Sequence, residues 1–122
     1  MSITKKIYIR PIKIINNIFI GSSKSLNKNI LKKYKIEHVV KIGPAFLVVN
    51  NKTTVHHNNN QYINDNIKEL LSKIEDTNVI ISCNSGSDKS VDGIKYILIN
   101  QYNMKEKNAN KYIKSIHPLA NI

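Results

Sequence analysis

The chain has 122 residues, a formal net charge of +11 and a single cysteine. This length fits one domain with its own hydrophobic core, so we expect residues 1–122 to form a single domain. No apolar run is long enough to span a membrane, and the N-terminus does not read as a secretory signal. We therefore expect neither a transmembrane segment nor a signal peptide. One cysteine excludes an internal disulfide and indicates a reducing, intracellular setting, in the cytoplasm or the nucleus.

The positive charge allows two interpretations. Clustered lysines bind phosphate backbones by releasing counterions, so the charge could serve a nucleic-acid partner. However, the chain contains 18 Lys, 18 Asn and 22 Ile against one arginine, Arg10. These three abundant residues are those that A/T-rich codons encode. A bias in base composition would therefore supply the charge with no partner behind it, and we favour this second interpretation.

In the first half of the chain, short runs of β-branched residues predict strands. The expected strands cover residues 7–9, 12–20, 38–42 and 46–49. Pro11 separates the first two, and residues 16–17 break the second into two parts. Between residue 20 and residue 38, Ser23 or Ser25 can cap a helix that ends at about residue 34.

In the second half, apolar periodicity predicts helices. Residues 50–61 contain too many asparagines for regular structure, so we expect them to form a loop that precedes the first of these helices. Residues 62–75 carry isoleucine and leucine at the spacing of one helix face. Residues 79–82, VIIS, predict a buried strand, and a helix that begins near Ser90 follows it. Residues 104–116 predict a last helix.

Strands that alternate with helices predict an α/β sheet, whose ligands bind beyond the carboxyl ends of the strands. Cys83 directly follows the expected strand at 79–82, so we expect the functional site there. Residues 83–90, CNSGSDKS, include Gly86, which lets backbone amides approach a ligand closely. The first N–H groups of the next helix lack intrahelical partners and carry the positive end of its dipole. This segment therefore predicts a phosphate site.

The pattern Cys83-x5-Lys89-Ser90 resembles the loop H-C-x5-R-[S/T] of the small dual-specificity class of cysteine-dependent protein phosphatases. Three further segments resemble that family in the same order. Residues 17–22 are similar to its NLYLGS strand, residues 34–40 to its GITHVLN strand, and residues 116–121 to its turn RP-x-A-x-PN. The resemblance implies a central mixed, mainly parallel sheet flanked by helices. The chain ends just after that turn, so we expect the family's last helix to be missing.

The resemblance also implies roles for the residues of this loop. Cys83 would be the nucleophile, although Ser82 stands where the family has a histidine, and Ser90 would help the thiolate leave in the second step. Lys89 stands in the place of the family's arginine and supplies charge without the planar two-bond fork. The phosphate-binding residues would be Asn84, Ser85, Gly86, Ser87, Asp88 and Lys89.

Each of these residues also has a purely structural interpretation. Cys83 could be a small apolar side chain at the end of a strand. Lys89 could be a solvated lysine in the first turn of a helix, with Asp88 weakening any anion site if its carboxylate turns inward. Ser90 could cap that helix.

The family's general acid, an aspartate upstream of the cysteine, is absent: there is no Asp or Glu between Glu37 and Asp65. His56 or His57 could donate a proton instead, because imidazolium titrates near neutrality, but adjacent loop histidines are usually idle. With Cys83 they lack a fourth ligand and a recognised zinc spacing. We therefore expect no metal and no cofactor.

The missing groups predict a pseudophosphatase that binds a phosphorylated protein through residues 83–90, or another protein partner through a different surface. The alternative is weak or unconventional hydrolysis of a phosphoprotein or of an RNA 5′-triphosphate, whose pyrophosphate leaving group needs little help from an acid. Nonspecific nucleic-acid binding through the lysines is a third hypothesis. If the missing helix leaves an apolar patch exposed, a second copy of the chain could cover it in a homodimer.

Overall fold

The computed structural model describes residues 10–42, 53–58, 68–69, 71–72, 76–83, 89–118 and 120. The strands expected at 7–9 and 46–49 lie outside the described residues, as does the segment 84–88 of the predicted phosphate loop.

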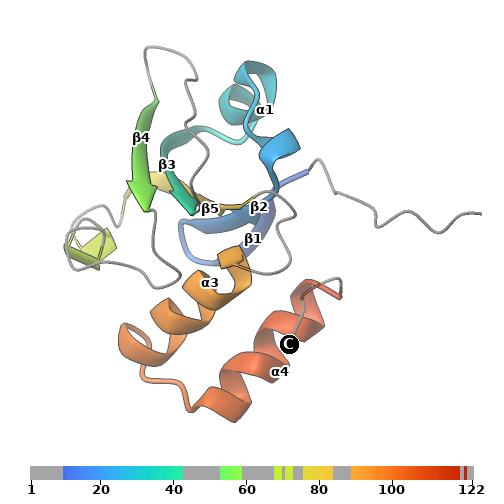
Figure 1. The fold of residues 1–122 in the computed structure, drawn as a ribbon, viewed down its shortest axis with the longest axis vertical. Coiled ribbons are helices and arrows are strands. Elements are labelled where there is room, and N and C mark those ends of the chain that lie inside the picture. Colours follow the sequence, from blue (N-terminus) through green and yellow to red (C-terminus); the bar gives the residue numbers. More distant parts are fainter. Residues whose placement is uncertain are drawn as a thin grey trace, which may run out of the picture.

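A five-stranded mixed sheet forms the centre of the molecule (Figure 1). Its strands are β1 (Ile12–Ile15), β2 (Ile18–Gly21), β3 (Ile36–Ile42), β4 (Thr54–Asn58) and β5 (Asn78–Ser82). They are ordered β1-β2-β5-β3-β4. Among the strands that the structure describes, β1 alone runs antiparallel, to β2, and the other neighbouring strands pair in parallel. The expected mixed, mainly parallel sheet is confirmed.

The break expected at residues 16–17 is the turn between β1 and β2. Asn16 has a φ of 49°, in the left-handed region that asparagine tolerates better than most residues. Asn17 donates from its side-chain amide to the carbonyl oxygen of Thr77, which ties this turn to the start of β5. The local sequence therefore defines both the hairpin and its attachment to the central strand.

Strand β4 corrects the prediction of a loop at residues 50–61. Thr54 to Asn58 pair in parallel with His38 to Ile42, with Val55 opposite Val39. Val55 also packs against the cluster of buried side chains around α1. Asparagine content argued for a loop, but strand preference depends strongly on packing and pairing. Here β3 provides the backbone partner, and this pairing makes residues 54–58 a strand although their composition disfavours one.

The helix expected from Ser23 or Ser25 begins later. Ser23–Ser25 form a 3-10 turn, η1, and the helix α1 spans Lys28–Lys33. Its cap is Asn27, whose side-chain oxygen accepts the N–H of Ile30 at 3.0 Å. Ser23, Ser25 and Asn27 are all good capping residues, so the local sequence alone does not fix where the helix starts. The start at Lys28 lets both Leu26 and Leu31 be buried against the sheet.

Two longer helices, α3 (Lys89–Asn100) and α4 (Glu106–Ile116), pack on one face of the sheet, and α1 covers the other (Figure 1). Both helices lie within two residues of their expected positions. The buried residues of α3 include the apolar face expected from its periodicity, namely Val91, Ile94, Ile97 and Leu98. Tyr112 of α4 is half-buried and donates its hydroxyl to the carbonyl oxygen of Ile14, which ties α4 to β1.

The helix expected at residues 62–75 is described only at residues 68–69 and 71–72, which are helical, with Leu71 buried in the core. The remainder of that prediction lies outside the described residues. Among the described residues, no helix is both long and apolar enough to cross a membrane.

Candidate functional site

The carboxyl ends of three parallel strands meet next to Cys83. Within the sheet, Ser82 is the register partner of Gly21 on one side and of Lys41 on the other. Cys83 is the next residue and is 3% exposed. The sheet therefore places the thiol at the edge where ligands of α/β folds bind, as the sequence predicts.

Close packing at Gly21 holds this edge together. A Cβ atom at that position would lie 2.5 Å from Cδ1 of Ile80 and 3.0 Å from Oγ of Ser25. Ser22 and Ser25 are fully buried, and Ser25 Oγ accepts the N–H of Ser22 at 3.2 Å. Only glycine lets the η1 turn approach β5 this closely, and this contact supports the strand that ends at Cys83.

The Cys83 sulfur forms hydrogen bonds with the first turn of α3. The backbone N–H of Ser90 donates to Sγ at 3.3 Å, and Sγ lies 3.2 Å from the Ser90 hydroxyl. Both residues are buried. Ser90 is the second residue of α3, so its N–H is one of the groups that no helical carbonyl can accept. Such contacts at a helix N-terminus stabilise a thiolate, the form in which a cysteine acts as a nucleophile.

Lys89 begins α3 and its side chain is exposed. Its charge is nonetheless felt inside the site, since it lowers the pKa of Lys41. The structure thus places Lys89 beside the Cys83–Ser90 pair and within electrostatic range of a buried cation. Residues 84–88, the rest of the predicted phosphate-binding loop, lie outside the described residues.

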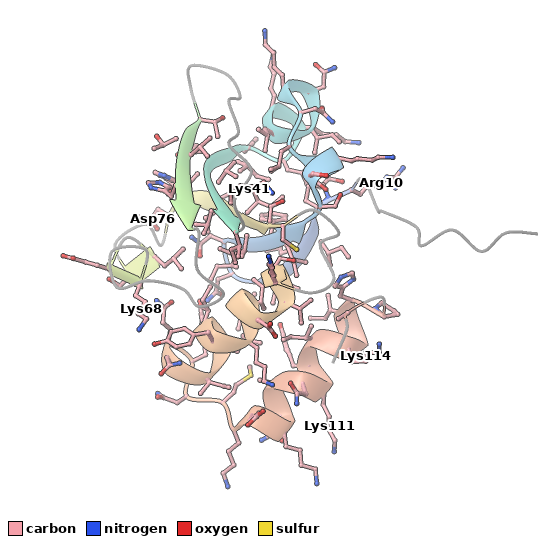
Figure 2. All side chains as sticks on the ribbon, in the orientation of Figure 1. Arg10, Lys41, Lys68, Asp76, Lys111 and Lys114 are labelled. Carbon is pink, nitrogen blue, oxygen red and sulfur yellow. The ribbon has the colours of Figure 1, made fainter. Side chains whose placement is uncertain are left out.

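Lys41 is the residue that sequence reasoning missed. It lies near the carboxyl end of β3 and is only 3% exposed (Figure 2). Burial is the largest cause that lowers its pKa from the usual 10.5, the charge of Cys83 opposes the change, and Lys89 reinforces it. The available signal was a lysine within the otherwise apolar run Val39, Val40, Lys41 and Ile42.

His56, one of the two candidate replacements for the acid, lies in β4. Its Nε2 atom is 3.2 Å from Nδ1 of His38 on the neighbouring strand. One imidazole must donate and the other accept in this contact, so it engages a nitrogen that an acid would need. The side chain of His57 lies outside the described part of the chain. Among the described residues, no group of three or more His, Cys, Asp or Glu side chains could hold a metal ion.

No family model matches the chain, and no curated protein matches it. Solved structures do. A leucine-rich-repeat and phosphatase-domain protein from Entamoeba histolytica is 18% identical, with a TM-score of 0.74 over 93% of this chain and 83% of that one. A mouse protein described as a dual specificity phosphatase, solved with zinc tungstate, is 13% identical, with a TM-score of 0.74 over 99% and 84%.

A third similar structure is the human tyrosine phosphatase-like serine/threonine/tyrosine-interacting protein, which is 20% identical, with a TM-score of 0.66 over 93% of this chain and 88% of that one. The chain has the dual-specificity phosphatase fold. The fold that the loop pattern of Cys83, Lys89 and Ser90 implied is therefore the fold that the structure has. At these identities the likeness shows the dual-specificity phosphatase fold alone, so the chemistry of the site must be argued from its own residues.

Proposed function

We propose that this chain is a catalytically impaired protein of the dual-specificity phosphatase fold that binds a phosphorylated protein at the Cys83 site. The observation that carries the proposal is the Cys83–Ser90 pair, in which the backbone N–H of Ser90, at the start of α3, donates to the sulfur at 3.3 Å. An N–H that can face a sulfur anion can also face a phosphoryl oxygen. The exposed Lys89, the first residue of α3, adds positive charge next to Ser90.

The same residues argue against efficient turnover. Lys89 replaces the arginine fork, and no Asp or Glu is found between Glu37 and Asp65 to protonate a leaving group. General acid catalysis is worth roughly 10²–10⁴ in rate. Losing one preorganised electrostatic donor costs roughly 10²–10³. Even if the two losses are not additive, a protein that lacks both groups retains binding far better than catalysis.

A second candidate function is weak cysteine-dependent hydrolysis of a phosphoprotein or an RNA 5′-triphosphate. It is favoured by the retained Cys83–Ser90 contact, because a serine hydroxyl 3.2 Å from the sulfur can stabilise a departing thiolate. A pyrophosphate leaving group would also reduce the need for an acid. Against it stands Lys89, since a lysine cannot hold two phosphoryl oxygens in one plane.

The two functions separate in one hydrolysis experiment on an aryl phosphate and on an RNA 5′-triphosphate. The proteins are the wild type, Cys83→Ser, and a repaired variant that combines Lys89→Arg with Asn50→Asp. A matched control combines Asn50→Asp with Lys111→Arg, which places the arginine on an exposed position of α4. We expect no turnover by the wild type and measurable turnover by the repaired variant alone.

Each other outcome contradicts a specific part of the proposal. Wild-type turnover that disappears with Cys83→Ser would establish the second candidate, and the better substrate would identify the reaction. Equal activity of the repaired variant and its Lys111→Arg control would show that the loop position does not matter. Silence from all proteins would contradict the phosphate site and favour a protein partner on another surface.

A further inference from the structure

A cavity of about 730 Å³ lies at the opposite end of the sheet from Cys83. The turn between β1 and β2, the start of β5 and the two residues after α3 contribute to its lining. Ile18 lines the cavity and begins β2. Gly21 ends β2 and is the register partner of Ser82, the residue before Cys83. The cavity is therefore separate from the proposed phosphate site, and its volume is typical of sites for small ligands.

The polar side chains around this cavity present oxygen atoms. Asn16 donates from its amide nitrogen to the Tyr102 hydroxyl at 3.0 Å, and the amide nitrogen of Gln101 faces the carbonyl oxygen of Lys68 at 3.5 Å. An amide that turns its nitrogen to a protein oxygen keeps its own oxygen for another donor. Asp76, which also lines the cavity, is exposed and forms no ion pair with any described residue (Figure 2). The cavity thus offers hydrogen-bond acceptors, one of them charged.

The cavity also lies at the C-terminal end of α3. Gln101 and Tyr102 directly follow this helix, which ends at Asn100. The carbonyl groups of the last turn give a helix end a partial negative charge, which favours a cation. The chain contains 18 lysines, yet none lies in the last turn of α3. The ammonium of Lys68 lies 4.5 Å from the centre of the Tyr96 ring, one turn before the helix end. The helix itself therefore supplies no cation for its negative end.

The remaining lining suits a planar cation on an apolar stem. Ile18 and Leu71 are buried and apolar, and Tyr102 is a half-buried aromatic ring. A guanidinium group stacks on aromatic rings, pairs with a carboxylate through two parallel hydrogen bonds and is weakly hydrated. An ammonium group is a strongly hydrated point charge without this planar geometry. The lining therefore favours guanidinium over ammonium.

We propose that this cavity binds an alkylguanidinium cation. Asp76 pairs with the guanidinium group, and the ring of Tyr102 contacts its face. The amide oxygens of Asn16 and Gln101 accept its other N–H groups. An arginine side chain of a partner protein and a free small molecule both carry this group. The net charge of +11 opposes any cation, so we expect weak binding of a small molecule.

The test follows the backbone amide signals of the isotope-labelled protein by NMR during titration with agmatine, a small alkylguanidinium. N-acetylarginine amide, N-acetyllysine amide and N-acetylcitrulline amide are titrated in the same way, since citrulline has the shape of arginine without its charge. Asp76→Asn removes the carboxylate charge, and Gln101→Lys places a cation at the cavity. Glu37→Gln is the matched control, because it removes the same charge at an exposed position of β3.

We expect agmatine and the arginine derivative to shift the signals of residues around the cavity, the lysine derivative to bind more weakly and the citrulline derivative not to bind. Asp76→Asn should weaken agmatine binding by roughly tenfold, as loss of a charge-assisted hydrogen bond does. Gln101→Lys should abolish it and still fold, because a cation at a helix C-terminus is favourable. Glu37→Gln should bind as the wild type does.

A further titration with an arginine-containing peptide identifies the source of the ligand. Tighter binding of the peptide than of agmatine would assign the site to an arginine side chain of a partner protein. Equal or tighter binding of agmatine would assign it to a free small-molecule cation.

Four results would overturn the inference. These are no shift in the wild type, equal binding of the citrulline and arginine derivatives, equal binding of the lysine and arginine derivatives, and equal weakening by Asp76→Asn and Glu37→Gln. The last result would show general attraction of cations rather than a site. None of them affects the proposed function, because hydrolysis and phosphate binding are measured at Cys83, at the other end of the sheet.

Discussion

At the scale of single residues, Lys41 shows how a buried charge reduces the stability of the fold. Its pKa is lowered in the folded state, chiefly by burial, from the usual 10.5. The unfolded chain therefore binds more protons than the folded chain between the folded pKa and 10.5. By linkage, the free energy of unfolding rises with pH across that window, and the ammonium destabilises the fold at lower pH.

We predict that Lys41→Met increases the free energy of unfolding at neutral pH, because the folded chain then no longer holds an ammonium group whose pKa is lowered, chiefly by burial. We expect this advantage over the wild type to shrink as the pH approaches 10.5, where the wild-type ammonium is lost. Urea unfolding of both proteins at several pH values measures the difference, in which the other titrating groups cancel. A difference that stays constant with pH would contradict the burial of a charged amine.

The residues of the site were only partly accessible to sequence reasoning. Cys83 and Ser90 could be found because their spacing places them at the two ends of a loop between a strand and a helix. Lys41 could not be found in the same way. It is distant in the sequence, and only the parallel pairing of β3 with β5 brings it to Cys83. Its single local signal, a charge within an apolar run, could equally have marked an exposed edge position.

At the scale of elements, the periodicity of apolar residues predicted the helices better than residue composition predicted the strands. The buried face of α3 followed directly from the spacing of Val91, Ile94 and Ile97. Strand β4 did not follow from its sequence, because residues 54–58 become a strand through pairing with β3 and packing of Val55. Edge strands of this kind depend on a partner that is specified elsewhere in the chain.

The capping of α1 gives a prediction at this scale. Asn27→Ala should lower the free energy of unfolding by about 1 kcal/mol, since it removes the acceptor of the Ile30 N–H. Asn29→Ala, an exposed substitution inside the same helix, is the matched control and should not destabilise the protein. Thermal and urea denaturation measure both changes. If Ser23→Ala lowered the free energy of unfolding more than Asn27→Ala, Ser23 would be the cap, as the sequence predicted.

At the scale of the whole molecule, the cations that Figure 2 labels come from several elements. Arg10 lies at the start of β1, Lys68 on the side of the sheet near β4, and Lys111 and Lys114 along α4 (Figure 2). Proteins that bind nucleic acid through charge collect lysines and arginines on one face or along one helix. We keep base composition as our interpretation of the net charge of +11, because the chain has 18 Asn and 22 Ile beside its 18 Lys.

This interpretation predicts how the protein responds to RNA. Binding of a single-stranded RNA with a 5′ hydroxyl should be weak at physiological salt, with a dissociation constant of roughly 10⁻⁴–10⁻⁶ M, and should fall steeply as salt increases. Lys111→Met and Lys13→Met, on opposite ends of the chain and both exposed, should each weaken binding slightly and to a similar extent, because diffuse charge has no privileged residue. Fluorescence anisotropy at several salt concentrations measures both effects.

Cys83→Ser should leave this RNA affinity unchanged, because a diffuse charge interaction does not involve the thiol. A 5′-triphosphate on the same RNA provides the decisive comparison. If the triphosphate increases affinity and Lys41→Met and Lys89→Met abolish the increase, the Cys83 site itself recognises RNA ends, and the phosphoprotein assignment is wrong. If the triphosphate changes nothing while a phosphopeptide still binds, the general surface charge and the Cys83 site act independently, because the Ser90 N–H at the start of α3 is not part of the diffuse charge.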